Sequence, residues 1–396
     1  MSDWGRRAGE SVAGFTSTGS KRPEALFGGP GGPTHAVRAS GSRVQTADGR
    51  SLIDWTMALG AVGLGYGHPA VVEAVERAVR DGAVYPLPPT LEVEVAERLR
   101  EAYPGAQRVR FLKTGAEAVQ AAVRLSRLAT GRDRVVCCGY HGWLDGAFGG
   151  AGVPRGAAEQ WTSVPFDDVF AAATAVDAPA PPAAILVEPV VERAPGPDWL
   201  PALRRLADGS GAVLVFDEIK TCFRLARGGA AQRWGVAPDL AVLGKAMANG
   251  FPLAAVVGRA DLMDGVKGTW ISSTLATETV SLAAAAAVLD VWGATDVASR
   301  VAATGRAVLD GLRPLGPAAG FEVGGLPEMW FLRFARRESE RALLLGGVDR
   351  GVLLKRGAYN FPSLAHGAAE VAATLEAVAA VVEGIANGAG APGGGP

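Results

Sequence analysis

The sequence predicts an α/β protein with a large domain built on a mostly parallel central sheet and a smaller α+β domain. Three observations predict this fold. Short apolar runs alternate with amphipathic stretches from about residue 108 to residue 258, the apolar runs stop at polar or small residues, and the pattern changes to helices and short strands from about Thr295. Strands that alternate with helices form parallel sheets covered on both faces, and ligands bind beyond the carboxyl ends of such strands.

The first part of the chain predicts a hairpin and two helices. An Asp-Gly pair at residues 48–49 lies between two alternating runs and predicts a β-hairpin. His68-Pro69 predicts the start of a helix, because proline suits the first helical turn. Four valines would share one face of this helix: Val71, Val72, Val75 and Val79. A second helix is expected over Thr90–Tyr103, with Thr90 as its N-cap.

The alternating region supplies the expected sheet and its covering helices. We expect helices over Gly115–Leu128 and Leu200–Asp208, and a further helix from about Glu278. The expected strands are Arg108–Leu112, Arg134–Cys138, Ala183–Glu188, Ala212–Asp217, Pro238–Gly244 and Leu253–Gly258. The expected domains are an N-terminal arm with part of the small domain (1–50), a large domain (51–294), a C-terminal small domain (295–386) and a disordered tail (387–396).

Composition excludes several classes of protein. The net charge is −1 and basic residues form no long run, so neither nucleic acid nor an anionic membrane is an expected partner. The three cysteines, Cys137, Cys138 and Cys222, lack the spacing of metal ligands or of a disulfide framework. They fit a reducing cytoplasm, and we expect no bound metal. The richest apolar stretch, Ser281–Trp292, is too short to span a bilayer.

Two polar residues that end apolar strands suggest the chemistry. Lys245 follows the run Pro238–Gly244, and Asp217 ends the run that starts at Ala212. Burial makes the neutral amine of a lysine available as nucleophile and base, and a buried carboxylate needs a partner. Pyridoxal 5′-phosphate (PLP) satisfies both, because it forms a Schiff base with lysine and its protonated pyridine nitrogen pairs with an acid. For Asp217, the alternative is a carboxylate that caps or braces the following loop.

Three further motifs could complete such a site. Thr114-Gly115-Ala116 lies between a strand and a helix, where backbone N–H groups favour a phosphate, although an N-capped turn is the alternative. Tyr140 and His141 follow a strand, where an aromatic ring can stack on a flat cofactor or pack at an edge. The hydroxyl cluster at residues 272–274 precedes a helix, either as phosphate donors or as the helix cap.

The order of these motifs resembles the class III (omega) aminotransferases of PLP fold type I, most closely the glutamate-1-semialdehyde aminomutase branch. The resemblance runs from about Ala47 to Gly258 and returns near Arg350 to His366, so it covers most of the chain. Its most specific block is Val215-Phe-Asp-Glu-Ile-Lys-Thr-Cys-Phe-Arg, followed by Gly-Val-Ala-Pro-Asp-Leu at residues 235–240 and by Leu-Gly-Lys245.

The resemblance implies a role for each candidate residue. Lys245 would form the Schiff base and Asp217 would hold the protonated pyridine nitrogen, while Tyr140 and Ile219 would lie on opposite faces of the ring. The cofactor-binding set would be completed by Thr114, Gly115, Ala116, His141, Glu188, Ser273 and Thr274. Thr274 would reach the phosphate of the neighbouring subunit's cofactor, so the resemblance implies a homodimer with shared sites.

Several positions depart from the family pattern. Asn360 stands where the aminomutases place a glutamate after a tyrosine, which argues against the mutase reaction. Lys355 and Arg356 could meet an anionic or polyhydroxylated substrate, or could be surface charges at a domain edge. Where the family often places an asparagine or glutamate against the cofactor, the candidates are Glu192 and Arg193.

The sequence therefore predicts a PLP-dependent aminotransferase that moves an amino group from an amino-acid donor to a small carbonyl acceptor. Lys245 would act as general base and acid. The acceptor could be a sugar or nucleoside aldehyde or ketone of secondary metabolism. Two alternatives stay open. One is another reaction on the same cofactor, as in an intramolecular aminomutase or an amino-acid racemase or epimerase. The other is a protein that binds PLP or a partner without catalysis.

Overall fold

The computed structural model describes residues 3–147 and 149–386, and the chain divides into two compact units. The central unit comprises Pro69–Ala298. The terminal unit combines the chain up to His68 with the chain from Ser299 onward. The tail predicted to be disordered, 387–396, lies outside the described residues.

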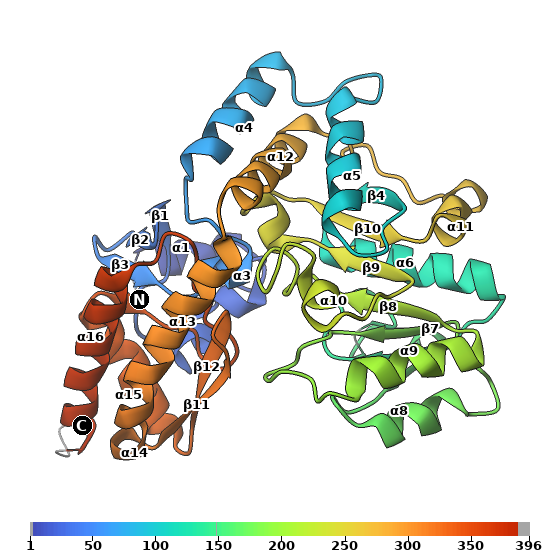
Figure 1. The fold of residues 1–396 in the computed structure, drawn as a ribbon. Helices are drawn as coiled ribbons and strands as arrows, with labels where there is room; N and C mark the ends of the chain where they lie inside the picture. Colours follow the sequence, from blue (N-terminus) through green and yellow to red (C-terminus); the bar gives the residue numbers. More distant parts are fainter. Residues whose placement is uncertain (1–2, 148, 387–396) are drawn as a thin grey trace. The chain divides into compact units, whose positions relative to one another are not determined.

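A seven-stranded sheet forms the middle of the central unit (Figure 1). Its strands, in spatial order, are β4 (Arg108–Leu112), β10 (Ala254–Gly258), β9 (Leu240–Leu243), β8 (Val213–Asp217), β7 (Ala184–Val187), β5 (Val135–Cys138) and β6 (Trp161–Ser163). The strands from β9 to β6 run parallel, whereas β10 is antiparallel to both of its neighbours. The predicted mostly parallel sheet is confirmed. In addition, β4 points the same way as β9, because both oppose β10.

Helices cover this sheet with their apolar faces. α6 (Gly115–Thr130) packs on β9 and β10, and α9 (Trp199–Ser210) packs on β7 and β8. Ala118, Val119 and Ala122 lie on one face of α6, as the helical period of 3.6 requires, and are fully buried. The other helices of this unit are α4 (Pro69–Asp81), α5 (Thr90–Ala102), α7 (Arg155–Ala158), α8 (Val169–Val176), α10 (Gly229–Trp234), α11 (Ala260–Met263) and α12 (Thr279–Ala294), with 3₁₀ helices η2 (Lys245–Ala248) and η3 (Asp264–Gly268).

The apolar face of α4 is only partly buried within this chain. The helix packs against α12, and the two side chains that it buries are Val71 and Ala78, which lie about two turns apart. Val72 and Val79, which the sequence analysis placed on the same face, are exposed. A one-face pattern of valines therefore does not by itself identify the side of a helix that meets the core.

The predicted N-cap of α5 is also wrong. Thr90 is the first helical residue, and the N-cap is Pro89, whose backbone is extended (φ −73°, ψ 147°). No side chain caps the helix at this position. Proline fits because it has no backbone N–H group to satisfy at a helix start.

The terminal unit joins strands from both ends of the chain. Its four-stranded sheet has the order β1 (Ala36–Ser40), β2 (Arg43–Thr46), β3 (Ser51–Asp54) and β13 (Val352–Leu353). β2 and β3 form the hairpin predicted from the Asp-Gly pair, with Gly49 at a positive φ of 88°. The sequence predicts that residues 51–68 belong to the large domain. The structure groups them here, because β3 pairs with β2 and with the C-terminal β13.

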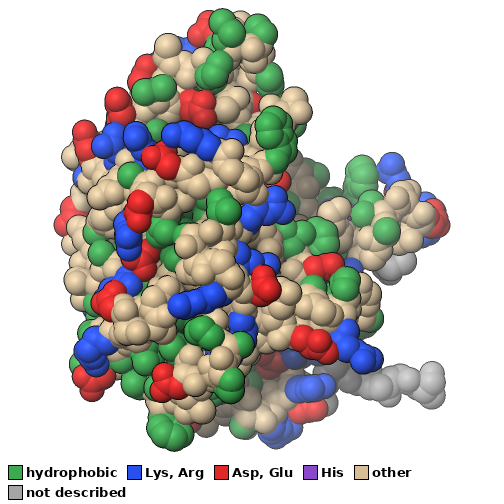
Figure 2. Space-filling model, turned by 90° about the vertical axis from the view of Figure 1, so that its right-hand side faces the viewer, with side chains coloured by type: hydrophobic (Ala, Val, Ile, Leu, Met, Phe, Trp, Pro, Cys, Tyr) green, Lys and Arg blue, Asp and Glu red, His purple; other side chains and the backbone are tan. Residues whose placement is uncertain are grey.

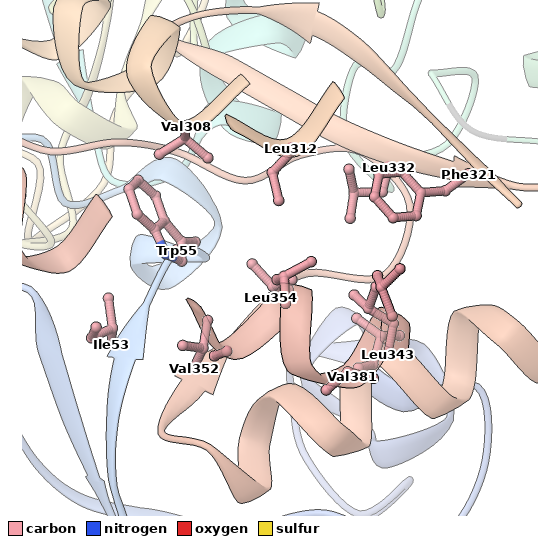
Figure 3. Packing of buried hydrophobic residues seen from close by; sticks show 14 of the residues in the cluster. Ile53, Trp55, Val308, Leu312, Phe321, Leu332, Leu343, Val352, Leu354 and Val381 are labelled. Carbon is pink, nitrogen blue, oxygen red and sulfur yellow. The ribbon is translucent and has the colours of Figure 1, made fainter. Parts of the chain in front are cut away.

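One apolar cluster holds the terminal unit together (Figure 3). Ile53, Val352 and Leu343 come from distant parts of the chain and pack into the same core. Trp55 is fully buried, and its indole N–H donates to the hydroxyl of Thr374 at 2.9 Å. The remaining elements of this unit are α1 (Asp3–Ser11), η1 (Gly19–Lys21), α2 (Pro23–Phe27), α3 (Met57–Gly60), α13 (Val297–Leu312), η4 (Arg313–Leu315), α14 (Gly316–Ala319), β11 (Phe321–Leu326), β12 (Met329–Phe334), α15 (Arg337–Asp349) and α16 (Ala368–Ala386).

Surface charges are mixed in sign. On the face shown in Figure 2, lysine and arginine side chains lie among aspartate and glutamate side chains. Within the described residues, no single helix is long and apolar enough to cross a membrane. Two consecutive helical segments, Thr279–Ala294 and Val297–Ala319, reach the length and apolar composition of a membrane span only when they are counted together, and the chain bends by 80° between them.

Candidate active site

The carboxyl ends of five strands meet at one edge of the central sheet. β4, β9, β8, β7 and β5 all point the same way, so the residues that end or follow them gather there. These residues are Gly115, Lys245, Asp217, Glu188 and Tyr140. The strands hold this edge in place, because every residue of β7, β8 and β9 is buried.

Lys245 lies just beyond β9, where the backbone leaves the strand. Its φ of 48° lies in the left-handed region that non-glycine residues rarely adopt, and such conformations cluster at functional sites. The pKa of its amine is lowered to about 8, mainly by burial and next by the neighbouring cation of Lys220. Glu188 and Asp217 act in the opposite direction. Near pH 8 a large share of this amine is therefore neutral and able to act as nucleophile or base.

Asp217 is 3% exposed and its two carboxylate oxygens have protein partners. Oδ2 lies 2.9 Å from Nδ1 of His141, and Oδ1 accepts the backbone N–H of Ile219 at 3.2 Å. The other ring nitrogen of His141, Nε2, lies 3.1 Å from the carbonyl oxygen of Cys138, which can only accept. His141 thus bridges the carboxylate of Asp217 and the backbone of Cys138. Each carboxylate oxygen retains a lone pair for another donor.

Glu188 ties the end of β7 to two neighbours. Its Oε2 accepts the backbone N–H of Tyr140 at 3.0 Å, and its Oε1 lies 2.8 Å from Nζ of Lys220. The carboxylate leaves no room for a side chain at Gly139, where a Cβ would lie 2.5 Å from Oε2. Glu188 thus fixes the turn that carries Tyr140, which is 60% exposed.

Thr114 starts α6 as its N-cap, in a capping box with Glu117. The Thr114 N–H donates to Glu117 Oε2 at 2.8 Å, and the Glu117 N–H donates to Thr114 Oγ1 at 3.3 Å. The predicted N-capped turn is present. The polar groups of Thr114 are engaged at the helix start, and the following N–H groups point out of the helix.

Glycines bring this helix start close to the other strand ends. A Cβ on Gly115 would collide with the side chain of Ile219, which directly follows Asp217 and Glu218. A Cβ on Gly142 would lie 2.7 Å from Cβ of Ala116. The structure therefore places Gly115 beside Ile219, and Ala116 beside the turn that carries Tyr140 and His141.

The hydroxyl cluster before α12 does not cap the helix. The N-cap is Glu278, whose carboxylate accepts backbone N–H groups of the first helical turn and pairs with Nζ of Lys113 at 2.6 Å. The capping interpretation of the cluster is therefore wrong. Ser273 and Thr274 are exposed on the segment that leads to the helix.

Known proteins share this architecture. A family model described as aminotransferase class-III matches residues 30–382. The chain belongs to the class-III aminotransferases. A glutamate-1-semialdehyde 2,1-aminomutase of Symbiobacterium thermophilum is 35% identical over 88% of this chain and 90% of its own. The PLP internal aldimine form of the Sphingopyxis sp. FumI protein has a TM-score of 0.90 and 26% identity, covering 97% of this chain and 96% of its own. An omega-transaminase from Sphaerobacter thermophilus has a TM-score of 0.86 and 27% identity, covering 96% of each chain.

The chain is a PLP-dependent enzyme of this aminotransferase family, with the PLP fold type I. The residues at the sheet edge fit the cofactor. Its aldehyde needs a neutral amine, and Lys245 has a lowered pKa. Its ring nitrogen needs a carboxylate with a spare lone pair, as Asp217 has. Its phosphate needs donors, and α6 directs backbone N–H groups to this edge from a start where Gly115 has no side chain.

Three candidates in the terminal unit of the aminotransferase have local partners. The amine of Lys355 donates to the carbonyl oxygens of Arg356 at 2.8 Å and Ala25 at 3.4 Å. The guanidinium of Arg356 donates to Glu340 at 2.9 Å. Asn360 is fully buried, and its Oδ1 accepts the backbone N–H of Lys355 at 2.7 Å. All three side chains thus hold the local structure of the terminal unit.

Of the two candidates after β7, Arg193 pairs with Asp167, and its guanidinium carbon lies 5.2 Å from the ring centre of Phe166. Its contacts are with a neighbouring loop, not with the Lys245 group. Glu192 adopts a positive φ of 56°. Arg193 therefore has local partners, and the role of Glu192 stays a prediction.

Two cations that act on Lys245 were not predicted from the sequence. Lys220 and Arg224 both act on the pKa of Lys245, and Arg224 is only 3% exposed. Lys220 and Arg224 flank the segment Thr221-Cys222-Phe223, whose three side chains are buried in the structure. A charged residue within a run of buried neighbours indicates a site or a paired charge.

The three cysteines, Cys137, Cys138 and Cys222, are buried. Burial raises the pKa of the Cys137 thiol to about 11 and that of Cys138 to about 12, and it raises the pKa of Cys222 well above the ordinary value. A thiolate, rather than a thiol, is the nucleophile. Structural packing is therefore the role of these side chains.

Proposed function

We propose that this enzyme transfers an amino group from an amino-acid donor to a small carbonyl acceptor. One observation supports this proposal above the others. The Lys245 amine, with its lowered pKa, the Asp217 carboxylate and the start of α6 all lie at the carboxyl ends of the central strands. An amine that is partly neutral near pH 8 can remove a proton and return it.

Each of these residues has a chemical task. PLP, when bound, supplies an aldehyde that takes up the amine and a ring that withdraws the electrons left by a departing proton. Nζ of Lys245 removes the proton from the α-carbon of the donor and returns it one step later. The carboxylate of Asp217 holds a proton on the ring nitrogen, and His141 supports that carboxylate from its other side.

Binding tasks fall to the surrounding residues. The backbone N–H groups of Gly115 and Ala116, at the N-terminus of α6 capped by Thr114, would bind the phosphate. The ring of Tyr140, exposed and fixed through Glu188, would cover one face of the cofactor ring. Ile219 would exclude water from the other face.

We infer a homodimer in which Ser273 and Thr274 serve the neighbouring subunit. Both hydroxyls are exposed before α12 and do not cap it. Large apolar side chains on α4, on α5 and between them are also exposed: Val72, Val79, Val84, Leu87 and Val93. A second copy that covers them would remove an exposed apolar patch from water. Sedimentation of the purified enzyme tests this, and a monomer would contradict it.

A second candidate is an intramolecular aminomutase reaction. Curated relatives at 32–35% identity are named glutamate-1-semialdehyde 2,1-aminomutase. Solved structures at 26–27% identity are named transaminases, among them a β-phenylalanine aminotransferase from Variovorax paradoxus. Asn360, at the place where the aminomutases have a glutamate, weighs against this reaction, and its buried side chain holds the Lys355 backbone instead.

The deciding experiment counts products per site. The purified enzyme loaded with PLP is given one amino acid at a time, without an acceptor, and the released oxo acid is measured. A transferase releases one oxo acid per site and continues only when a carbonyl acceptor is added; the acceptor panel includes sugar and nucleoside carbonyl compounds. Many turnovers on a single substrate would favour the mutase. No change with any amine would favour a binding protein.

A further inference from the structure

We propose that Lys220 is a positioning residue of this site, which holds the carboxylate of Glu188 and so keeps it from forming an ion pair with Lys245. The proposal rests on the assignment of Lys245 as the reactive lysine of the proposed function. Lys220 would touch neither substrate nor cofactor. It would act through Glu188 on the charge state of Lys245 and on the turn that carries Tyr140.

The ion pair between Lys220 and Glu188 is largely buried in the central unit. Nζ of Lys220 lies 2.8 Å from Oε1 of Glu188, and the two side chains are 11% and 8% exposed. The second oxygen of Glu188 accepts the N–H of Tyr140 at 3.0 Å. A Cβ at Gly139 would lie 2.5 Å from that oxygen, so the surrounding backbone is shaped around the carboxylate. A buried pair is costly to desolvate, which makes a purely stabilising role a poor explanation.

Charges of both signs act on the Lys245 amine. The cations Lys220 and Arg224 lower its pKa, and the anions Glu188 and Asp217 raise it. Asp217 is also bound to His141. Without Lys220, two anions would face one cation. A carboxylate without its partner would then attract the ammonium form of Lys245 and hold its proton.

Lys220 occupies a position next to the strand end, two residues beyond Glu218. An apolar side chain there would leave Glu188 with the Tyr140 N–H as its remaining described partner. The carboxylate could then rotate toward the Lys245 amine and release the turn at Gly139. Loss of Lys220 should therefore change both the protonation of Lys245 and the order of Tyr140.

The test titrates Lys245 in the cofactor-free protein. Competitive labelling with acetic anhydride, followed by mass spectrometry of the peptide that holds Lys245, gives the pH at which half of this amine is neutral. In Lys220→Met this midpoint should rise by about one unit or more, whereas in Glu188→Gln it should fall. Lys220→Arg keeps the charge and should leave the midpoint near that of the native protein. In the PLP-loaded protein, the pH dependence of cofactor absorbance should move in the same directions.

Controls separate this role from a structural one. Lys267→Met removes an exposed lysine of the same unit, 80% accessible and 3.7 Å from Asp264, and should change nothing. The double variant Lys220→Met/Glu188→Gln removes both charges of the pair and should restore the native midpoint. An unchanged midpoint in folded Lys220→Met would overturn the proposal. So would failure of both the single and the double variant to fold, since the pair would then serve stability. The labelling needs no turnover, so its outcome is independent of the transfer reaction.

Discussion

Each unit contains a lysine whose pKa is lowered mainly by burial, yet the surroundings of the two amines differ. Lys355, in the terminal unit, donates to the carbonyl oxygens of Arg356 and Ala25. Lys245, in the central unit, is influenced by four charged side chains of both signs and stands on a backbone with positive φ. The comparison teaches that burial alone does not identify a reactive amine. Charged groups of both signs also act on Lys355, where Arg356 lowers the pKa and Glu340 raises it. What sets Lys355 apart is the pair of backbone carbonyl oxygens that hold its ammonium group in place.

The largest effect that would sharpen this contrast is expected from Lys245→Ala. Without the amine, neither proton transfer nor attachment of the cofactor is possible, and amino transfer should fall by at least about a thousandfold. The cofactor absorbance of the purified protein should also change to that of unattached PLP. Steady-state turnover and an absorption spectrum measure both effects. Normal turnover in this variant would refute the proposed mechanism.

Asp217→Asn should have the next largest effect. Asparagine keeps the size of the side chain and can accept from the Ile219 N–H, but it has no negative charge to hold a proton on the ring nitrogen. A hydrogen bond to a charged group contributes about 1.5–3 kcal/mol, so turnover should fall about 10- to 150-fold. Asp261→Asn, at an exposed position of the same unit, is the matched control. Equal rates for the two variants would contradict the role of Asp217.

Gly115→Ala should weaken cofactor binding more than it weakens the fold. The new methyl group would collide with Ile219 and push the start of α6 away from the strand ends. PLP affinity of the cofactor-free protein, followed by absorbance titration, should fall about tenfold, since a 1.4 kcal/mol loss is tenfold. Gly115→Ala/Ile219→Val removes the Cδ1 atom nearest to the new methyl and should recover part of the loss. Gly209→Ala, which has open space around it, is the control that should bind PLP normally.

The smallest effect on turnover is expected from Lys355→Met. Its amine has local acceptors, so turnover should stay within about twofold, while the stability of the terminal unit falls by about 1–3 kcal/mol because two carbonyl oxygens lose a donor. Kinetics and thermal unfolding measure the two quantities. A large rise in KM for the acceptor would show instead that Lys355 meets the substrate, and the contrast between the two lysines would then fail.

Much of the fold follows from local patterns. Apolar runs that stop at Asp217 and near Lys245 identified neighbouring strands, and the Asp-Gly pair identified the hairpin, because these signals depend on a few adjacent residues. Patterns that involve only a few adjacent residues could not show to which unit residues 51–68 belong. Their place depends on β13, nearly three hundred residues further along the chain.

The candidate site shows the same limit. Residues that end strands were found because sheet topology brings strand ends together. The partners of those residues were not found, since the Lys220–Glu188 pair, the Lys113–Glu278 pair and the Gly115–Ile219 contact join distant segments. The local hydrogen bond of Asn360 was missed for a related reason. A substitution read from a family pattern does not reveal that the new side chain holds a neighbouring backbone.

The raised pKa values of the three cysteines have a practical consequence. At neutral pH almost none of their sulfur is in the nucleophilic form, so maleimide and iodoacetamide reagents should modify the folded enzyme slowly. The native chain can therefore serve directly as a background for site-specific labels. A cysteine introduced at the exposed Gly209, where an added side chain meets open space, would carry a fluorophore or spin label without prior removal of the natural sulfhydryl groups.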